Sequence, residues 1–235
     1  MGKRCSFAYW SVGKSMKMAS RLIRESEMWL RYRLMDIRGR GVYAHHANAC
    51  QCIFIHIPKA AGSSISQTLF QQPSRHVPYF EYERASPRKF RKFFKFTFVR
   101  NPWDRLVSTY FFLKRGGVNQ LDANWAVDHL SDYQNFEEFV HDGLRTDSVR
   151  EWIHFRPQTY FIADAEGDIK VDFIGRFEKI ERDFCLIEKK LGCEHELRKM
   201  NVGQHAHYRD YYTKETKKIV YDFYERDIEL LQYLF

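Results

Sequence analysis

A short segment of the chain combines a lysine, a glycine and two serines in a spacing that suits an anion. The segment 58–64, P-K-A-A-G-S-S, lies between an apolar, β-branched run and a helix-compatible stretch. Backbone N–H groups in the first turn of a helix have no partners within the helix, and the helix dipole is positive there. Such a junction attracts phosphate or sulfate, and Lys59 adds a mobile positive charge. The predicted anion site comprises Lys59, Ala60, Ala61, Gly62, Ser63 and Ser64.

The position of Lys59 distinguishes this segment from the phosphate-binding loop of nucleotide triphosphatases. That loop reads G-x-x-x-x-G-K-[ST], with the lysine after the glycines. In this chain Lys59 precedes Gly62. We therefore expect a phosphate-like ligand but no ordinary ATP or GTP site. A small-molecule kinase with a variant loop stays as an alternative, which magnesium-dependent ATP binding would favour.

A second segment, 98–110, carries another cationic site. Arg100 follows an apolar run, at the place where a parallel strand delivers ligand-binding side chains, and its planar fork suits a dianionic phosphate. Ser108 lies four residues after Asp104, so both share one face of the following helix. Two anion sites on neighbouring strands imply a ligand with two phosphate-like ends. The alternative for Arg100 is a structural salt bridge.

Strands and helices alternate along the chain, and this order must position both sites. Alternation of this kind predicts an α/β fold with a central, mainly parallel sheet flanked by helices, and ligands at the carboxyl ends of the strands. Pro73, Pro78 and Pro87 predict a loop region between the first helix and the second strand. The expected strands are 53–57, 95–100 and 169–176. The expected helices are 63–71, one from Pro102 to the glycines at 116–117, short pieces near 125–130, 135–141 and 148–155, then 180–191, and a final helix capped by Thr213.

Length and charge bound the possible partners. The chain has 235 residues, enough for one good core, with 29% charged and 17% aromatic residues, which is a globular composition. We expect a single main domain over 50–235 and an N-terminal helical extension over 1–49. The net charge of +8 favours a polyanionic partner: nucleotide, nucleic acid, acidic polysaccharide or membrane surface. A merely basic surface is the alternative.

The cysteine pattern and the hydropathy of the chain bear on metal binding, on the redox compartment and on membrane insertion. Five cysteines without a C-x-x-C pair predict free thiols in a reducing compartment. No metal site is expected, because Cys50 and Cys52 lead into a strand and nothing completes a set with His45 and His46. No apolar run approaches the ~20 residues that span a bilayer. We expect a soluble, cytoplasmic protein; a luminal enzyme without its anchor would look the same. The helix expected over 15–37 could pack on the domain or touch a membrane surface or a partner.

Together the two segments resemble those of the sulfotransferases that use 3′-phosphoadenosine 5′-phosphosulfate (PAPS). I-P-K-A-A-G-S-S is similar to the family's 5′-phosphosulfate loop, and F-V-R-N-P-W-D-R-L-V-S-T-Y is similar to its 3′-phosphate motif. Three further segments, at 154–158, 171–178 and 208–213, extend the resemblance over about residues 52–235. It is nearest to the carbohydrate branch, which includes glycosaminoglycan 2-O-sulfotransferases. The resemblance implies an enzyme with the P-loop-like sulfotransferase fold and PAPS as its donor.

Residue roles follow from the resemblance. It implies that Lys59 and the loop 60–64 hold the 5′-phosphosulfate and that Arg100 and Ser108 hold the 3′-phosphate. Arg209 and Tyr212 would lie in a C-terminal loop that closes over the nucleotide. His76 matches the family's catalytic base, with Glu81 or Glu83 as alternatives, and His154 would be substrate-side or structural.

The implied reaction is an in-line displacement in which Lys59 and the loop amides stabilise the leaving phosphate and a histidine removes the acceptor's proton. The implied acceptor is a carbohydrate hydroxyl, on an anionic chain given the basic surface; nucleic acid is not expected as a partner. A non-catalytic protein that binds RNA or anionic glycan is the remaining alternative, since aromatic and basic residues interleave over 90–96. We favour a helix end and a core strand there. The sequence predicts no oligomeric state.

Overall fold

The structure is a computed structural model that describes residues 30–31, 33–35, 38, 41–44, 46–197 and 205–235. Most of the helix expected over 15–37, the start of the loop 200–212, and His45 lie outside the described residues.

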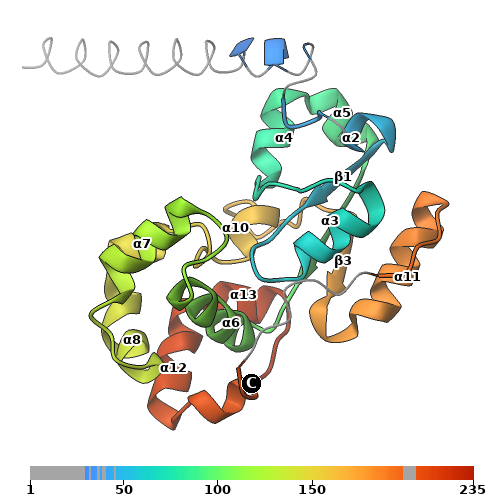
Figure 1. The fold of residues 1–235 in the computed structure, drawn as a ribbon. Coiled ribbons are helices and arrows are strands. Elements are labelled where there is room, and N and C mark those ends of the chain that lie inside the picture. Colours follow the sequence, from blue (N-terminus) through green and yellow to red (C-terminus); the bar gives the residue numbers. More distant parts are fainter. Residues whose placement is uncertain (1–29, 32, 36–37, 39–40, 45, 198–204) are drawn as a thin grey trace, which may run out of the picture.

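A three-stranded parallel sheet forms the centre of the fold (Figure 1). Its strands are β1 (Cys52–Ile55), β2 (Phe94–Val99) and β3 (Phe173–Arg176), in the order β1-β2-β3. The register pairs Ile53 with Lys95 and Thr97 with Ile174. The predicted α/β fold with a parallel sheet flanked by helices is confirmed.

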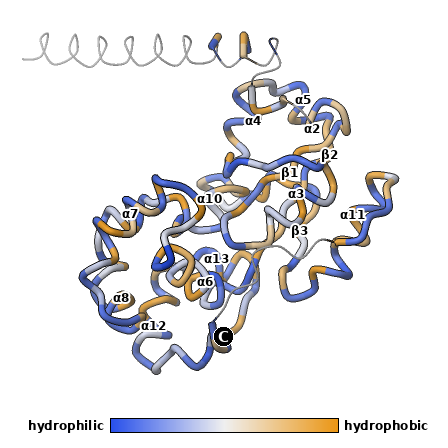
Figure 2. Tube along the Cα trace, in the orientation of Figure 1, coloured by the Kyte–Doolittle hydropathy of each residue, from blue (hydrophilic) through white to orange (hydrophobic). Residues whose placement is uncertain are grey.

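Both faces of the sheet are covered, which explains the continuous apolar runs in the sequence. Ile53 and Ile55 belong to one core cluster, whereas Phe54 and Phe96 belong to another, because successive strand residues point to opposite faces. Figure 2 shows hydrophobic residues concentrated along the strands, while outer helices alternate in hydropathy. Helices α3 (Gly62–Phe70) and α11 (Ile180–Leu191) contribute to the cluster of Phe54. Helices α2 (His46–Ala49), α4 (Tyr79–Ala85), α5 (Pro87–Lys92) and α10 (Thr159–Ile162) contribute to the cluster of Ile53.

A helical lobe follows β2 and has its own core (Figure 1). It starts with α6 (Pro102–Lys114), whose N-cap Asn101 accepts hydrogen bonds from the backbone N–H groups of Trp103 and Asp104 at 3.1 and 3.4 Å. This cap fixes the turn that carries Arg100. The lobe also contains α7 (Gln120–Leu130), α8 (Phe136–Asp142), α9 (Asp147–Glu151), α12 (Lys214–Phe223) and α13 (Glu225–Leu230). The 3₁₀ turns are η1 (Gly143–Arg145), η2 (Phe177–Lys179) and η3 (Tyr208–Tyr211).

Two boundary predictions are confirmed closely. The helix expected over 180–191 is α11, and Gly192 ends it in the left-handed conformation with φ 70°. Thr213 caps α12 through a capping box with Thr216. The final helix is nevertheless two helices, α12 and α13, because the chain bends at Tyr224.

The loop region expected between the first helix and the second strand is wrong in part, because it contains α4 and α5. Two prolines of this region, Pro78 and Pro87, stand where a helix tolerates proline. Pro78 is the N-cap of α4, and Pro87 is in the first turn of α5. Ser86 caps α5 by accepting a hydrogen bond from Lys89 N. The third strand is shorter than expected, since Ile169 forms only an isolated antiparallel bridge with Ala163.

Within the described part of the chain, no helix combines the length and the apolar character that crossing a membrane requires.

Candidate active site

The loop between β1 and α3 presents backbone donors to the carboxyl edge of the sheet. Lys59 and Ala61 both have φ 65°, in the left-handed region, so the loop turns sharply before α3 begins at Gly62. No side chain caps α3 at Ala61. First-turn N–H groups have no acceptor within a helix, so the start of α3 can donate hydrogen bonds to an anion, which is the role that the sequence predicts.

Gly62 is required by its contact with His56. A Cβ atom at Gly62 would lie 1.8 Å from His56 Cδ2, so only glycine lets the start of α3 approach the end of β1. His56 is buried, and its Nδ1 lies 2.8 Å from Ser74 Oγ. Burial lowers the pKa of His56 well below its usual value, so this imidazole is neutral.

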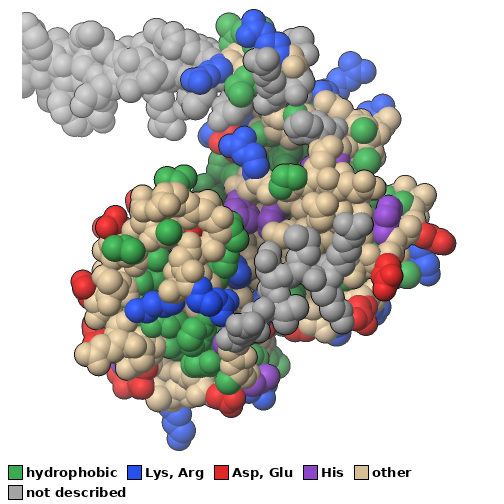
Figure 3. Space-filling model, in the orientation of Figure 1, with side chains coloured by type: hydrophobic (Ala, Val, Ile, Leu, Met, Phe, Trp, Pro, Cys, Tyr) green, Lys and Arg blue, Asp and Glu red, His purple; other side chains and the backbone are tan. Residues whose placement is uncertain are grey.

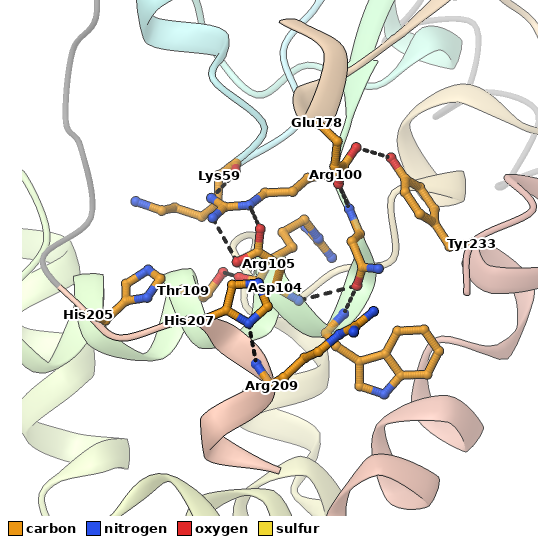
Figure 4. A network of polar contacts seen from close by, with 12 residues as sticks. Lys59, Arg100, Asp104, Arg105, Thr109, Glu178, His205, His207, Arg209 and Tyr233 are labelled. Atoms are coloured by element: carbon orange, nitrogen blue, oxygen red, sulfur yellow. Dashed lines mark hydrogen bonds and ion pairs between the residues drawn. The ribbon is translucent and has the colours of Figure 1, made fainter. Parts of the chain in front are cut away.

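Arg100 lies at the end of β2 and joins the two predicted anion sites (Figure 4). Its Nε and Nη2 donate to the two oxygens of Asp104 at 2.7 and 2.9 Å, and its Nη1 donates to the Lys59 carbonyl at 3.2 Å. The guanidinium also lies 4.1 Å from the ring centroid of Phe177. The salt bridge weighed as an alternative is thus present, and it holds Arg100 beside Lys59.

Residues outside the two segments hold the end of β2 in place. The Gln158 amide forms two 2.8 Å hydrogen bonds with the backbone N–H and carbonyl of Arg100. Glu178 accepts from Asn101 N at 2.6 Å and from Tyr233 Oη at 3.1 Å. Sequence reasoning missed both roles, although the segments that contain Gln158 and Glu178 were singled out by resemblance.

The Lys59 side chain lies over an aromatic ring of α6. Its Nζ is 3.9 Å from the ring centroid of Phe112. Burial, with nearby Arg100 and Arg115, lowers the pKa of Lys59 to about 8. The ammonium is therefore charged at neutral pH, but it loses its proton at a lower pH than an exposed lysine does.

The other residues predicted to bind nucleotide lie along α6 and η3. Ser108 is buried on α6, one turn after Asp104. Tyr212 donates from its hydroxyl to the Trp103 carbonyl at 2.9 Å, so this hydroxyl ties the C-terminal segment to α6. Arg209 lies in η3, which packs beside α6 (Figure 4), and its Nη2 donates to the Phe235 carbonyl at 2.9 Å. The nucleotide-binding roles of Ser108, Arg209 and Tyr212 all stay predictions.

Two predicted residues, His76 and His154, come together next to Lys59. The ring centroid of His76 is 4.2 Å from that of His56 and 5.6 Å from that of His154. His76 Nδ1 lies 3.0 Å from the His56 carbonyl, and burial lowers the pKa of His76 to about 4. Figure 3 shows histidines gathered in the hollow where the helical lobe meets the part that contains the sheet.

The alternative bases, Glu81 and Glu83, lie on α4, five and seven residues after His76. Glu81 is within 3.8 Å of Arg84, and Glu83 is exposed. Asp122, which sequence reasoning did not single out, contacts one of the clustered histidines: its Oδ1 is 3.1 Å from His154 Nε2. Asp122 and His154 are 32 residues apart, and no local pattern links them. The pairing of Asp104 with Arg100, which was also missed, did have a local signal, because the two residues are four apart in sequence.

The arrangement can bind an anion and accept a proton at neighbouring points. Lys59, Arg100 and the N-terminus of α3 supply positive charge and N–H donors at the ends of β1 and β2. A carbonyl can only accept, so His76 donates from Nδ1 and keeps a lone pair on Nε2. These are the groups that transfer of an anionic group to a hydroxyl requires.

Comparisons with known proteins agree with this geometry. The model of a family described as "Sulfotransferase family" matches residues 46–234. An uncharacterized protein from Archaeoglobus fulgidus is 29% identical over 134 residues, which are 54% of this chain and 91% of the archaeal protein. No solved structure matches significantly.

Proposed function

This chain belongs to the sulfotransferase family and is a sulfuryl-transferring enzyme, and from that premise we propose its donor, acceptor and base. The donor is PAPS, the acceptor is a hydroxyl of a carbohydrate, and His76 is the general base of an in-line displacement.

One observation carries the proposal for the donor. The hydrogen bond from Arg100 Nη1 to the Lys59 carbonyl fixes the two predicted anion sites side by side at the ends of β1 and β2. A nucleotide with a 5′-phosphosulfate and a 3′-phosphate has two anionic ends that would match them. Lys59 and the first N–H groups of α3 take the 5′-phosphosulfate, and Arg100 with Ser108 takes the 3′-phosphate.

The chemical step uses atoms that the site leaves open. The acceptor oxygen forms a bond to sulfur while the bond from sulfur to the 5′-phosphate oxygen breaks. The acceptor's proton passes to Nε2 of His76, and the electron pair leaves with 3′,5′-adenosine bisphosphate. Lys59 and the loop amides stabilise the charge that develops on that phosphate, as pre-oriented donors do in phosphoryl transfer.

An anionic polysaccharide is the acceptor class that the charge of the protein supports. The net charge of +8 attracts polyanions, and carbohydrate acceptors are what the resembled branch modifies. The cysteines that the structure describes are all free thiols, which supports a cytoplasmic place for the reaction.

The decisive experiment is transfer of labelled sulfate from PAPS to a panel of glycans and small alcohols. We expect labelled product on a hydroxyl-bearing glycan and calorimetric binding of 3′,5′-adenosine bisphosphate. Magnesium-dependent ATP binding without bisphosphate binding would instead support a variant kinase. Tight, salt-dependent RNA binding without transfer would support a non-catalytic polyanion binder.

A further inference from the structure

The turn after α6 is built around one buried carboxylate. Asp122, in the first turn of α7, is 3% exposed, and its Oδ2 accepts from Val118 N at 3.3 Å and from Asn119 Nδ2 at 3.1 Å. Gly117 has φ +65°, and a Cβ there would lie 2.1 Å from the Asp122 Cβ. The backbone therefore closes tightly on Asp122, which leaves Oδ1 as the oxygen that points to another partner.

That partner is His154, and the contact fixes its tautomer. His154 Nε2 lies 3.1 Å from Asp122 Oδ1, and both side chains are more than nine-tenths buried. An ionised carboxylate only accepts hydrogen bonds, so Nε2 carries the proton and Nδ1 keeps a lone pair. His154 Nδ1 is buried and forms no hydrogen bond within the part of the chain described. A buried acceptor without a partner costs about 1–3 kcal/mol, so its presence here calls for a functional reason.

The pair of Asp122 and His154 adjoins the proposed base, His76, through the ring of His154. The ring of His154 meets that of His76 edge to face, at 75° between their planes. Burial disfavours protonation of His76, and so do His154 and Lys59, whereas the hydrogen bond to the His56 carbonyl and the charge of Asp122 favour it. Burial would raise the pKa of Asp122, but its hydrogen bonds with His154 and with Val118 N lower it. Asp122 thus stays ionised beside the histidines.

We infer that Asp122 and His154 are positioning residues for the base, and that the Asp122 carboxylate, acting through His154, stabilises the imidazolium that forms on His76 during sulfuryl transfer. The inference rests on the proposed function. The proton moves only from the acceptor hydroxyl to His76 Nε2; His154 keeps its proton on Nε2, and Asp122 remains a carboxylate. His154, 7% exposed, has little surface to offer an acceptor directly.

The test is Asp122→Asn. Val118 N and Asn119 Nδ2 both need an acceptor, so the new amide oxygen should take the Oδ2 position and the amide nitrogen should face His154. His154 would then accept at Nε2 and carry its proton on Nδ1. Long-range ¹H–¹⁵N spectra of the nucleotide-free protein should show this change of tautomer. Asp128→Asn, on the exposed face of the same helix, is the control and should leave the tautomer unchanged.

The same variants separate positioning from binding. We expect Asp122→Asn to lower kcat about 10²-fold, with unchanged affinity for 3′,5′-adenosine bisphosphate. His154→Gln, which keeps a donor for Asp122, covers the case in which Asp122→Asn fails to fold, and it should lower kcat in the same way. If either variant turns over like the Asp128→Asn control, or the wild-type tautomer is Nδ1-H, the inference is overturned and the proposed function stands. If the wild type transfers no sulfuryl group from PAPS, the proposed function itself fails.

Discussion

Arg100 and Asp104 face each other in a two-point contact, with Nε 2.7 Å from Oδ2 and Nη2 2.9 Å from Oδ1. The contact orients the guanidinium before any ligand arrives. Of its five N–H groups, two point to Asp104 and one to the Lys59 carbonyl, which leaves two for a phosphate. An arginine held in this way loses little conformational entropy on binding.

Arg100→Lys should weaken binding of 3′,5′-adenosine bisphosphate about 10- to 100-fold, because lysine keeps the charge but cannot form the two-point contact. Isothermal titration calorimetry measures the change. Arg182→Lys is the matched control, since Arg182 is a largely exposed residue of α11 that likewise pairs with an aspartate, Asp183. Equal affinity in the two variants would mean that Arg100 does not hold the 3′-phosphate.

Lys59 should make nucleotide binding depend on pH. Its pKa is lowered to about 8, so the free ammonium loses its proton as pH rises through that value. A bound phosphate stabilises the charged form and raises this pKa, so binding near pH 8.5 should take up a proton, and affinity should fall between pH 7 and 9.5. Calorimetry in buffers of different ionisation enthalpy measures the uptake. Lys59→Arg, charged throughout, should show none; uptake that persists in this variant would assign the proton to another group.

His76→Ala should leave bisphosphate affinity unchanged and lower turnover about 10²–10⁴-fold, because the base acts in the chemical step only. Glu81→Gln and Glu83→Gln test the alternative bases and should turn over like the wild type. Labelled-sulfate transfer at saturating PAPS distinguishes these outcomes. Full turnover in His76→Ala with loss in one glutamate variant would move the base to α4.

Gly62→Ala and Ala61→Gly should shift stability in opposite directions. The added Cβ at position 62 would collide with the His56 ring, and overpacking of this kind costs about 1–3 kcal/mol. At position 61, φ is 65°, so glycine relieves up to about 1 kcal/mol of backbone strain. Thermal unfolding measures both. Adding His56→Ala to Gly62→Ala should restore part of the loss; additive effects would show that His56 is not the group displaced.

Much of the fold followed from local sequence. The runs around Ile53 and Thr97 are long enough and apolar enough to identify buried parallel strands, and Gly192 marks the end of α11 because it needs a positive φ. Local sequence does not distinguish loop from helix around Pro78 and Pro87, because proline is favoured both in turns and in the first turn of a helix; the helices α4 and α5 form there.

The candidate site also has a part that the sequence predicts and a part that it does not. The anion-binding segments could be predicted because a strand, a loop and a helix lie together in the chain. The partners of Arg100 and His154, namely Gln158 and Asp122, could not, because they lie 58 and 32 residues away and meet them only in the folded state.

The ring of Phe112 has a kinetic consequence. Lys59 Nζ lies 3.9 Å from its centroid, and the His154 ring lies 5.2 Å from it. The same benzene ring therefore contacts Lys59, which we place at the donor, and His154, whose ring lies against that of the proposed base. Phe112→Leu should accordingly change the Michaelis constants for both substrates together, and the occupancy of one subsite should be felt at the other.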